Sequence, residues 1–375
     1  MGYSCDAAAE RLAERLGHSC HHADPIVDFR NPFGLENATM PFLELLVIGG
    51  AVFALIHAWR RWRRDGDPVN ISLWFASIVY LAVIEPPLYF PGWFGLQEHV
   101  GLIFSHNVFT VQFMYDRLPL YIVAFYPALS QLAYEVIRAL GVFTRRGPLA
   151  GSLAVAFTCQ AFYEIFDQLG PQLKWWAWNP DNEMINAPAL ASVPMNSMFL
   201  FASVSFGAMT YLVVRLVGAK PGRGPLTGRQ ISLRALVAGA LTPLAMAVAG
   251  VPSNLFRGGD QLGIQQTILT TELVLVWIVG LGLLADAWRA PRAGQLPVAS
   301  LQFARIYPAL YLGVHLILWL IALPAYLAAA DGITEQGTPV GSLWYTGLCM
   351  IAAVGLIAAV LHATTPQRTG QPVRS

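Results

Sequence analysis

The sequence predicts an all-α integral membrane protein, a bundle of about nine transmembrane helices. Of its 375 residues, 55% are hydrophobic and only 12% are charged, whereas roughly a quarter are charged in an ordinary soluble domain. Apolar segments near twenty residues recur along the chain, and a helix of that length spans a hydrocarbon core of roughly 30 Å. We therefore expect one membrane domain with no soluble domain attached, in a multi-pass protein of the cell membrane.

Three regions follow from this pattern. Residues 1–40 contain Asp, Glu, Arg and His without a continuous apolar run, so they are not a signal peptide, and their segment 7–16 predicts a short amphipathic helix on the outer surface. The membrane domain covers 41–362, and a cytoplasmic tail, 363–375, follows it. The predicted spans are 41–59, 71–90, 119–141, 149–169, 195–217, 231–251, 265–288, 306–328 and 342–362.

The segments between the spans predict the orientation of the bundle. Nine spans place the two termini on opposite sides of the membrane. Basic residues gather after the odd-numbered spans, and the positive-inside rule assigns that side to the cytoplasm. The N-terminus is therefore expected outside. These basic residues are Arg60, Arg61, Arg63, Arg64, Arg145, Arg146, Lys220, Arg223, Arg229, Arg289, Arg292 and Arg305.

Charge balance, cysteine positions and the absence of known motifs limit the partners and cofactors that we expect. The 23 basic and 22 acidic residues give no general basic surface, so nucleic acid is not an expected partner. Cys5 and Cys20 are able to form a disulfide if the N-terminus is extracellular, while Cys159 and Cys349 lie in apolar segments as small hydrophobes. No nucleotide-binding, c-type haem or hydrolase motif occurs in a credible context, and we expect no cofactor.

Five carboxyl groups are placed at membrane depth, where an ionisable side chain needs a partner, a water-filled cavity or a chemical task. A count of 1.5 Å per helical residue puts all of them in the outer half of the bilayer, where one cavity would collect them. The structural alternative for each is a hydrogen bond to a loop amide or an ion pair with Lys174 or Arg117. The five acids are Glu85, Glu98, Glu164, Asp167 and Glu272.

Glu164 and Asp167 are three residues apart, so we expect them on one helix face. Two close carboxyl groups seldom both ionise in a low-dielectric site, and one that keeps its proton is able to protonate an olefin. Glu135 differs from this pair, because a local ion pair with Arg138, three residues later, explains it.

Two histidines lie in the outer segment 98–107, EHVGLIFSHN. Their spacing of seven places His99 and His106 on one face if this segment is helical. No HExxH or HxxxH pattern accompanies them, so we expect histidines hydrogen-bonded near the interface and no metal site.

Trp175, Trp176 and Trp178 follow directly after the fourth predicted span. Trp is typical of the membrane–water interface, where aromatic belts form. The same rings would also stabilise positive charge in a cavity that handles a carbocation. Both interpretations stand, because one residue can serve both purposes.

Two blocks on the predicted outer side resemble the motifs of a known family. The first, from Glu98 to Pro127, contains Gly101, Phe109 and a Leu-Pro-Leu element ahead of a new span. The second contains Asp167, Gly170, Pro171, Trp176, Trp178 and the run Val193-Pro194-Met195-Asn196. Together they resemble the carotenoid biosynthesis membrane proteins typified by the bisanhydrobacterioruberin (carotenoid 1,2-) hydratases.

The resemblance implies a hydratase, a hydro-lyase, or a membrane terpene cyclase of isoprenoid metabolism. A protonated carboxylic acid would donate its proton to an olefin, and the resulting tertiary cation would be captured by water or close a ring. The implied partners are a hydrophobic isoprenoid or polyene substrate and membrane lipids. The expected catalytic residues are Asp167 as proton donor, with Glu164, Glu98, Glu85 and Asn196. The expected substrate-binding residues are Trp176, Trp178, Trp175, His106, Asn107 and Glu272.

Two other classes of protein remain open from the sequence. In a transporter the buried acids would carry protons or bind a cation, and Pro86, Pro87, Pro243 and Pro324 would permit broken helices. The acids gather on one side, however, and do not trace a route across the membrane. In a non-catalytic assembly protein, the acids would serve only folding or partner binding.

Overall fold

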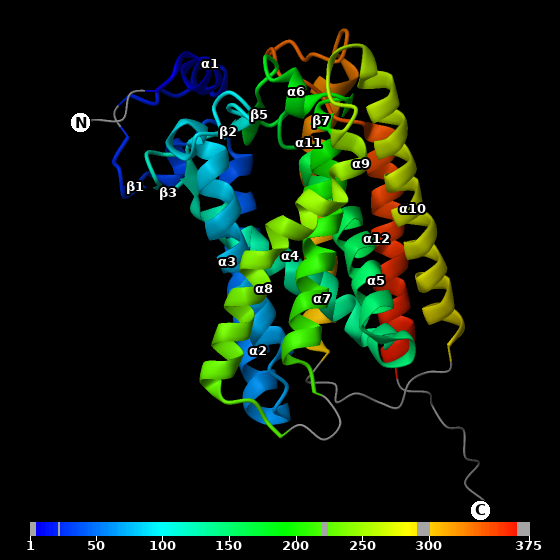
Figure 1. Ribbon diagram of the computed structural model, residues 1–375. Coiled ribbons are helices and arrows are strands. Elements are labelled where there is room, and N and C mark those ends of the chain that lie inside the picture. Colours follow the sequence, from blue (N-terminus) through cyan, green and yellow to red (C-terminus); the bar gives the residue numbers. More distant parts are fainter. Residues whose placement is uncertain (1–4, 22, 220–223, 291–300, 366–375) are drawn as a thin grey trace, which may run out of the picture.

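The computed structural model describes residues 5–21, 23–219, 224–290 and 301–365. Within these residues, nine helices are long and apolar enough to cross a membrane, which confirms the predicted multi-span bundle (Figure 1). Each overlaps one predicted span. They are α2 (Thr39–Asp65), α3 (Val69–Tyr89), α4 (Leu120–Ala139), α5 (Val142–Asp167), η3 (Ser197–Ser205) continuing as α7 (Phe206–Val217), α8 (Gly228–Ala249), α10 (Leu262–Arg289), α11 (Gln302–Leu327) and α12 (Leu343–Thr364).

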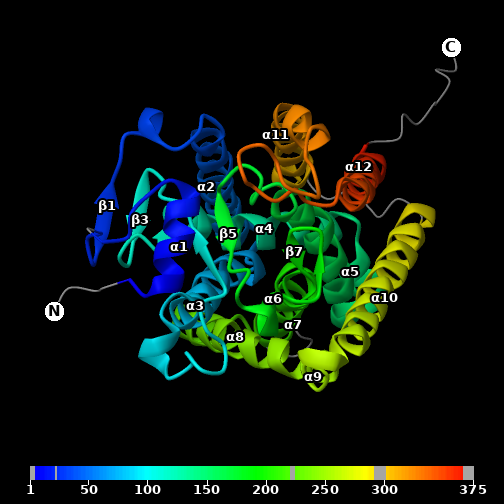
Figure 2. The ribbon, with the colours of Figure 1, turned by 90° about the horizontal axis from the view of Figure 1, so that it is seen from above.

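The helices differ in how much of their surface meets other helices. In the most apolar stretch of α4, 89% of the residues are buried inside the protein, against 17% in α10. Viewed from above, α4 lies in the middle of the bundle and α10 at its edge (Figure 2). From Val274 to Trp288 the exposed residues of α10 are apolar, among them Leu275 and Ile278. A lipid-facing helix needs only such a surface, whereas the central helix is able to hold polar groups inside the protein.

We name the two ends of the bundle by what they carry. The loop side carries α1 (Ala7–Leu16), three small sheets and the short helices, and the arginine side lies opposite (Figure 1). Of the basic residues used to predict the orientation, Lys220, Arg223 and Arg292 lie outside the described residues, as do 366–375 of the predicted tail.

On the arginine side, a buried polar network joins α2, α3 and α4. Glu135 accepts hydrogen bonds from Arg138 on both carboxylate oxygens, each at 2.7 Å. His57 Nε2 lies 3.0 Å from Glu135 Oε2, and Asn70 Nδ2 donates to Oε1 at 2.8 Å. The predicted pair with Arg138 is therefore confirmed, as one part of a larger network that neutralises this carboxylate.

Short antiparallel strands organise the loop side into three sheets. β1 pairs with β3 and β3 with β4, β2 pairs with β5, and β6 pairs with β7. In the second sheet, Phe104 lies opposite Trp178 and His106 opposite Trp176. The strands are β1 (Val27–Phe29), β2 (Phe104–His106), β3 (Val111–Phe113), β4 (Leu118–Pro119), β5 (Trp176–Trp178), β6 (Ala189–Leu190) and β7 (Val193–Pro194). The short helices are η1 (Pro32–Gly34), η2 (Pro91–Phe94), α6 (Glu183–Asn186), α9 (Val251–Asn254) and η4 (Gly259–Gln261).

The predicted amphipathic helix near the N-terminus is present as α1. Asp6 caps it by accepting a hydrogen bond from Ala9 N at 2.8 Å, and Gly17 ends it with a φ of 91°. Its apolar residues Ala9 and Leu12 are buried against Leu102 of the loop side. The apolar face therefore packs on the protein, whereas the sequence had suggested a helix lying on the outer surface.

Cys5 and Cys20 form a disulfide bond, with an S–S distance of 2.06 Å. The bond closes the segment that contains α1 and holds it near Arg117, whose guanidinium lies 3.5 Å from Cys5 Sγ. Disulfides persist mainly in oxidising compartments. The orientation that the arginines predict, with the N-terminus outside, stays a prediction.

Candidate functional site

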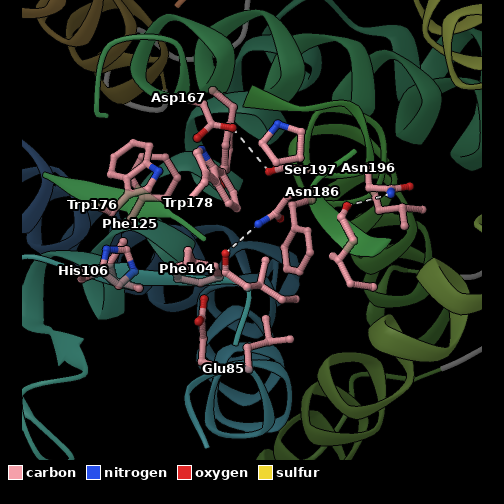
Figure 3. A pocket seen from close by; sticks show the side chains of 18 of the residues that line it. Glu85, Phe104, His106, Phe125, Asp167, Trp176, Trp178, Asn186, Asn196 and Ser197 are labelled. Carbon is pink, nitrogen blue, oxygen red and sulfur yellow. Dashed lines mark hydrogen bonds between the residues drawn. The ribbon is translucent and has the colours of Figure 1, made fainter. Parts of the chain in front are cut away.

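A cavity of about 200 Å³ lies in the loop-side half of the bundle (Figure 3). That volume is many times the ~10–15 Å³ that one buried water molecule needs on the same measure, so the cavity has room for a ligand much larger than water. Four membrane helices and four loop-side elements contribute to its lining. They are α3, α4, α5 and η3 with α7, together with β2, β5, β7 and the α6 region, and the lining also includes Asn254 at the end of α9 and Arg257 after it.

One wall of the cavity is aromatic. The ring of Phe166 lies 4.6 Å from that of Phe125 and 4.7 Å from that of Trp176, measured between centroids. Phe104 contacts Trp178 at 5.4 Å, across the β2–β5 pair. Such rings present negative faces to whatever occupies the cavity.

Gly170 makes the position of Trp176 possible. A Cβ atom added at this glycine would lie 1.9 Å from the indole ring of Trp176. Any side chain here would therefore push the indole out of the aromatic wall. The glycine in the second motif block thus has a packing reason to be there.

The opposite wall is polar (Figure 3). Asn186 Nδ2 donates to the carbonyls of Ile103 and Asn179, at 2.8 and 2.9 Å, and Asn196 Nδ2 donates to the carbonyl of Ile185 at 3.1 Å. Within the described part of the chain, the buried Oδ1 atoms of both asparagines have no hydrogen-bond partner. These two oxygens are free to accept a hydrogen bond from water or from a hydroxyl group.

Two buried carboxyl groups face the cavity from different helices. Asp167, at the end of α5, accepts a hydrogen bond from Ser197 Oγ at 3.4 Å. Glu85, in the last turns of α3, accepts one from Tyr126 OH at 2.5 Å. Among the described residues, no Lys, Arg or His nitrogen lies within 4.0 Å of either. Ionising such a group would leave a desolvated charge without a partner, which is costly.

His106 of β2 adds an imidazole to the cavity wall. Its Nδ1 lies 3.3 Å from Tyr121 OH. Burial lowers the pKa of His106 from 6.5 to about 3, because the charged form would lose its hydration. The imidazole is therefore neutral at pH 7 and able to accept or donate a hydrogen bond.

The five predicted acids do not share one cavity. Glu98 is exposed on the turn between η2 and β2, and Glu272 lies half-buried on α10, at the edge of the bundle; neither lines the cavity. Glu164 is fully buried but also does not line it. Its Oε2 accepts a hydrogen bond from Gln168 at 3.1 Å, and it lies near Tyr345 of α12.

The divergence of Glu164 from Asp167 has a geometric cause. Three residues turn a helix by about 300°, so the two side chains point about 60° apart. In the crowded centre of the bundle, that angle is enough to send Asp167 toward the cavity and Glu164 toward α12. The expectation that both would converge on one ligand is corrected accordingly.

Two more residues that were predicted to bind substrate hold parts of the fold together and do not line the cavity. Trp175 is fully buried in the core, where its Nε1 donates to Thr39 Oγ1 at 3.0 Å. Asn107 donates to the carbonyls of Leu16 and Lys174, at 3.0 and 2.8 Å, and so ties the N-terminal segment to the loops. Neither lines the cavity.

The histidine pair predicted to share a helix face is also separated. The segment that contains His99 and His106 forms a turn followed by a strand, and His99 is exposed. Across the described residues, no three His, Cys, Asp or Glu side chains lie close enough together to hold a metal ion.

Several cavity residues were not singled out from the sequence. Tyr126, Asn186 and Ser197 stand in ordinary apolar or loop contexts, and only their contacts across the chain reveal them. Arg257 and Asn254 follow the sixth span, far in sequence from either motif block. A signal did exist for Ser197, which directly follows Asn196.

Comparisons with protein-family models, with curated proteins and with solved structures found no match to this chain. What the fold and the site establish together is a multi-pass membrane protein with a cavity between its loop-side helix ends.

Proposed function

We propose that this protein is a membrane enzyme that protonates an olefin of an isoprenoid or polyene and completes the reaction by hydration or cyclisation. One observation carries the proposal above the others. Asp167 and Glu85 face a cavity with an aromatic wall, at membrane depth, without a cationic partner among the described residues. A substrate dissolved in the bilayer explains why the site lies within the bundle.

Asp167 is the proposed proton donor. Its protonated carboxyl group would transfer a proton to the less substituted carbon of a trisubstituted olefin, and the π electrons would form the new C–H bond. The other carbon becomes a tertiary carbocation, and Asp167 becomes a carboxylate. Ser197 Oγ, at 3.4 Å from Oδ2, orients the aspartate and stabilises the carboxylate that forms.

The aromatic wall would stabilise the cation through the faces of its rings. Water would then add to the cationic carbon and lose a proton to the Asp167 carboxylate, which restores the acid. The net reaction adds one water across one double bond and needs no oxidant or reductant. If an internal olefin attacks in place of water, a ring closes and the positive charge moves to another carbon. A carbon next to that one then loses a proton to the Asp167 carboxylate, which restores the acid.

The polar wall supports the hydration branch. The free Oδ1 atoms of Asn186 and Asn196 accept hydrogen bonds, so they are able to hold a water molecule by its protons and leave its lone pair directed at the cation. The resemblance of the two motif blocks to carotenoid hydratases points to the same chemistry. Cyclisation would require the substrate itself to cover this wall.

The test is product formation from an acyclic polyene with terminal isopropylidene groups, supplied to the purified protein in D₂O. The wild type is expected to form a tertiary alcohol or a ring that carries deuterium at the protonated carbon. Asp167→Asn should lower the rate by on the order of 100-fold or more, since general acid catalysis contributes that much.

The matched control is Glu98→Gln, which removes an exposed carboxyl group on the same side of the protein and should leave the rate unchanged. Unchanged product formation in a correctly folded Asp167→Asn protein would refute the proposed donor. Gradient-driven uptake of a solute into proteoliposomes, with no product formed, would favour a transporter.

A further inference from the structure

The cavity contains one side chain with a fixed positive charge among its described residues, Arg257. This arginine follows α9 on the loop side and is partly buried. No acidic side chain of the described chain lies within 4.0 Å of its guanidinium group. A partly buried arginine at the edge of an apolar cavity is costly unless an anion accompanies it.

The turn that leads into α9 lies close to η3. A Cβ atom added at Gly250 would lie 3.3 Å from Leu200 of η3 and 2.8 Å from Asn254 Nδ2. The buried Ser253 closes the same turn by donating to the Gly250 carbonyl at 3.2 Å. Asn254, at the end of α9, and Arg257, three residues later, both line the cavity.

The cavity combines an aromatic wall with a guanidinium group, so it suits a ligand that has an apolar part and an anionic part. The aromatic wall suits an apolar chain, and the guanidinium suits an oxyanion, which it is able to bind through two parallel N–H groups. Asn254 offers an amide beside it. Lipid head groups lie at the level of the helix ends, and α9 lies toward the loop-side ends of the long helices (Figure 1).

We infer that the cavity binds an isoprenoid that carries a phosphate group, with the phosphate at Arg257 and the prenyl chain against Phe104, Phe125 and Trp178. This inference rests on the proposed function and names its substrate class. It distinguishes the substrate from a neutral polyene, which offers nothing for the guanidinium to bind.

The inference is tested by measuring how tightly farnesyl phosphate binds to the purified protein in neutral detergent. Isothermal titration calorimetry gives the dissociation constant. Farnesol and inorganic phosphate are the comparison ligands. The variants are Arg257→Gln, Arg257→Lys and, as matched control, Arg15→Gln, which removes an exposed arginine on the same side of the protein. Asp167→Asn is included because it should bind farnesyl phosphate as the wild type does while forming no product.

We expect farnesyl phosphate to bind the wild type more tightly than farnesol by on the order of ten-fold or more, the usual effect of a hydrogen-bonded charge. Arg257→Gln should remove that preference, Arg257→Lys should retain part of it, and Arg15→Gln should retain all of it. Equal affinity for farnesol and farnesyl phosphate would overturn the inference and leave olefin protonation untouched.

Two further results would also overturn it. Inorganic phosphate that binds as tightly as farnesyl phosphate would mean a site for the free anion. Phosphatidylglycerol, added in mixed micelles with the detergent, could also bind at this site. If it binds as tightly as farnesyl phosphate, Arg257 contacts the head groups of bulk lipid. Asp167→Asn keeps the two proposals distinguishable. If this variant binds farnesyl phosphate as the wild type does but forms no product, binding of the phosphate and protonation of the olefin depend on different residues.

Discussion

The two halves of this bundle treat buried carboxyl groups in opposite ways. On the arginine side, Glu135 is held by Arg138, His57 and Asn70, at distances of 2.7 to 3.0 Å. On the loop side, the hydrogen bonds that Asp167 and Glu85 accept from described residues come from hydroxyl groups, among them those of Ser197 and Tyr126.

The difference separates structure from chemistry at membrane depth. A carboxylate surrounded by cationic and amide donors is fixed in its charged form and joins helices. A carboxyl group bonded to hydroxyl groups beside a cavity keeps the freedom to give and take a proton. The contrast, more than the burial of any one acid, marks the loop side as the candidate site.

The largest expected effect is on the arginine side. Glu135→Gln would leave the charged Arg138 and the imidazole of His57 without their carboxylate, and breaking a buried ion pair costs about 3 to 5 kcal/mol. Asp167→Asn should change the free energy of unfolding by less than about 1 kcal/mol, since it leaves no charge unpaired. Equilibrium unfolding in mixed micelles measures both variants. Equal destabilisation by the two would remove the distinction between the halves.

A smaller effect is expected from Gly170→Ala, which tests the aromatic wall. The new methyl group would displace the indole of Trp176, and overpacking of this kind costs about 1 to 3 kcal/mol. Gly313→Ala on α11 is the control, because nothing lies within 4 Å of a Cβ added there. Thermal unfolding and Trp fluorescence report both changes. A wild-type melting temperature and emission spectrum in Gly170→Ala would contradict the described packing.

Counted per pH unit, the smallest effect is a pH dependence from His106. The unfolded chain binds a proton on this histidine below about pH 6.5, whereas burial lowers the pKa in the folded protein to about 3. Stability should therefore fall as the pH falls between these values, by up to roughly 1.4 kcal/mol per pH unit for one group.

His106→Gln should flatten this dependence between about pH 6 and pH 4, as followed by denaturant unfolding. The exposed His99 provides the control, since His99→Gln should leave the slope as in the wild type. An unchanged slope in His106→Gln would show that this imidazole is hydrated in the folded protein.

The sequence predicted what depends on neighbours along the chain. Segment length and hydropathy are local properties, so the nine spans were predictable, and so was the pair between Glu135 and Arg138 within one helical turn. The wall residues Trp176 and Trp178 and the acids Glu85 and Asp167 were also predicted as site residues, and they do line the cavity.

What the sequence missed depends on contacts between distant segments. The three-residue spacing of Glu164 and Asp167 does not predict that Glu164 points toward α12 while Asp167 faces the cavity. The residues around His106 form a strand because they pair with β5, some seventy residues later. Arg257 lines the cavity together with Leu200 and Phe201 of η3, which are distant from it in the sequence. None of these contacts has a signature in local composition or periodicity.

The most direct test of the central claim, that this cavity binds an isoprenoid, is mass spectrometry of the lipids that co-purify with the protein. Leu200 lines the cavity, so Leu200→Trp should fill it, whereas Leu236→Trp adds the same bulk to an exposed position on α8. We expect a prenyl or polyene lipid with the wild type and with Leu236→Trp, and its depletion from folded Leu200→Trp. The absence of any isoprenoid from the wild type, or equal amounts in all three proteins, would contradict the claim.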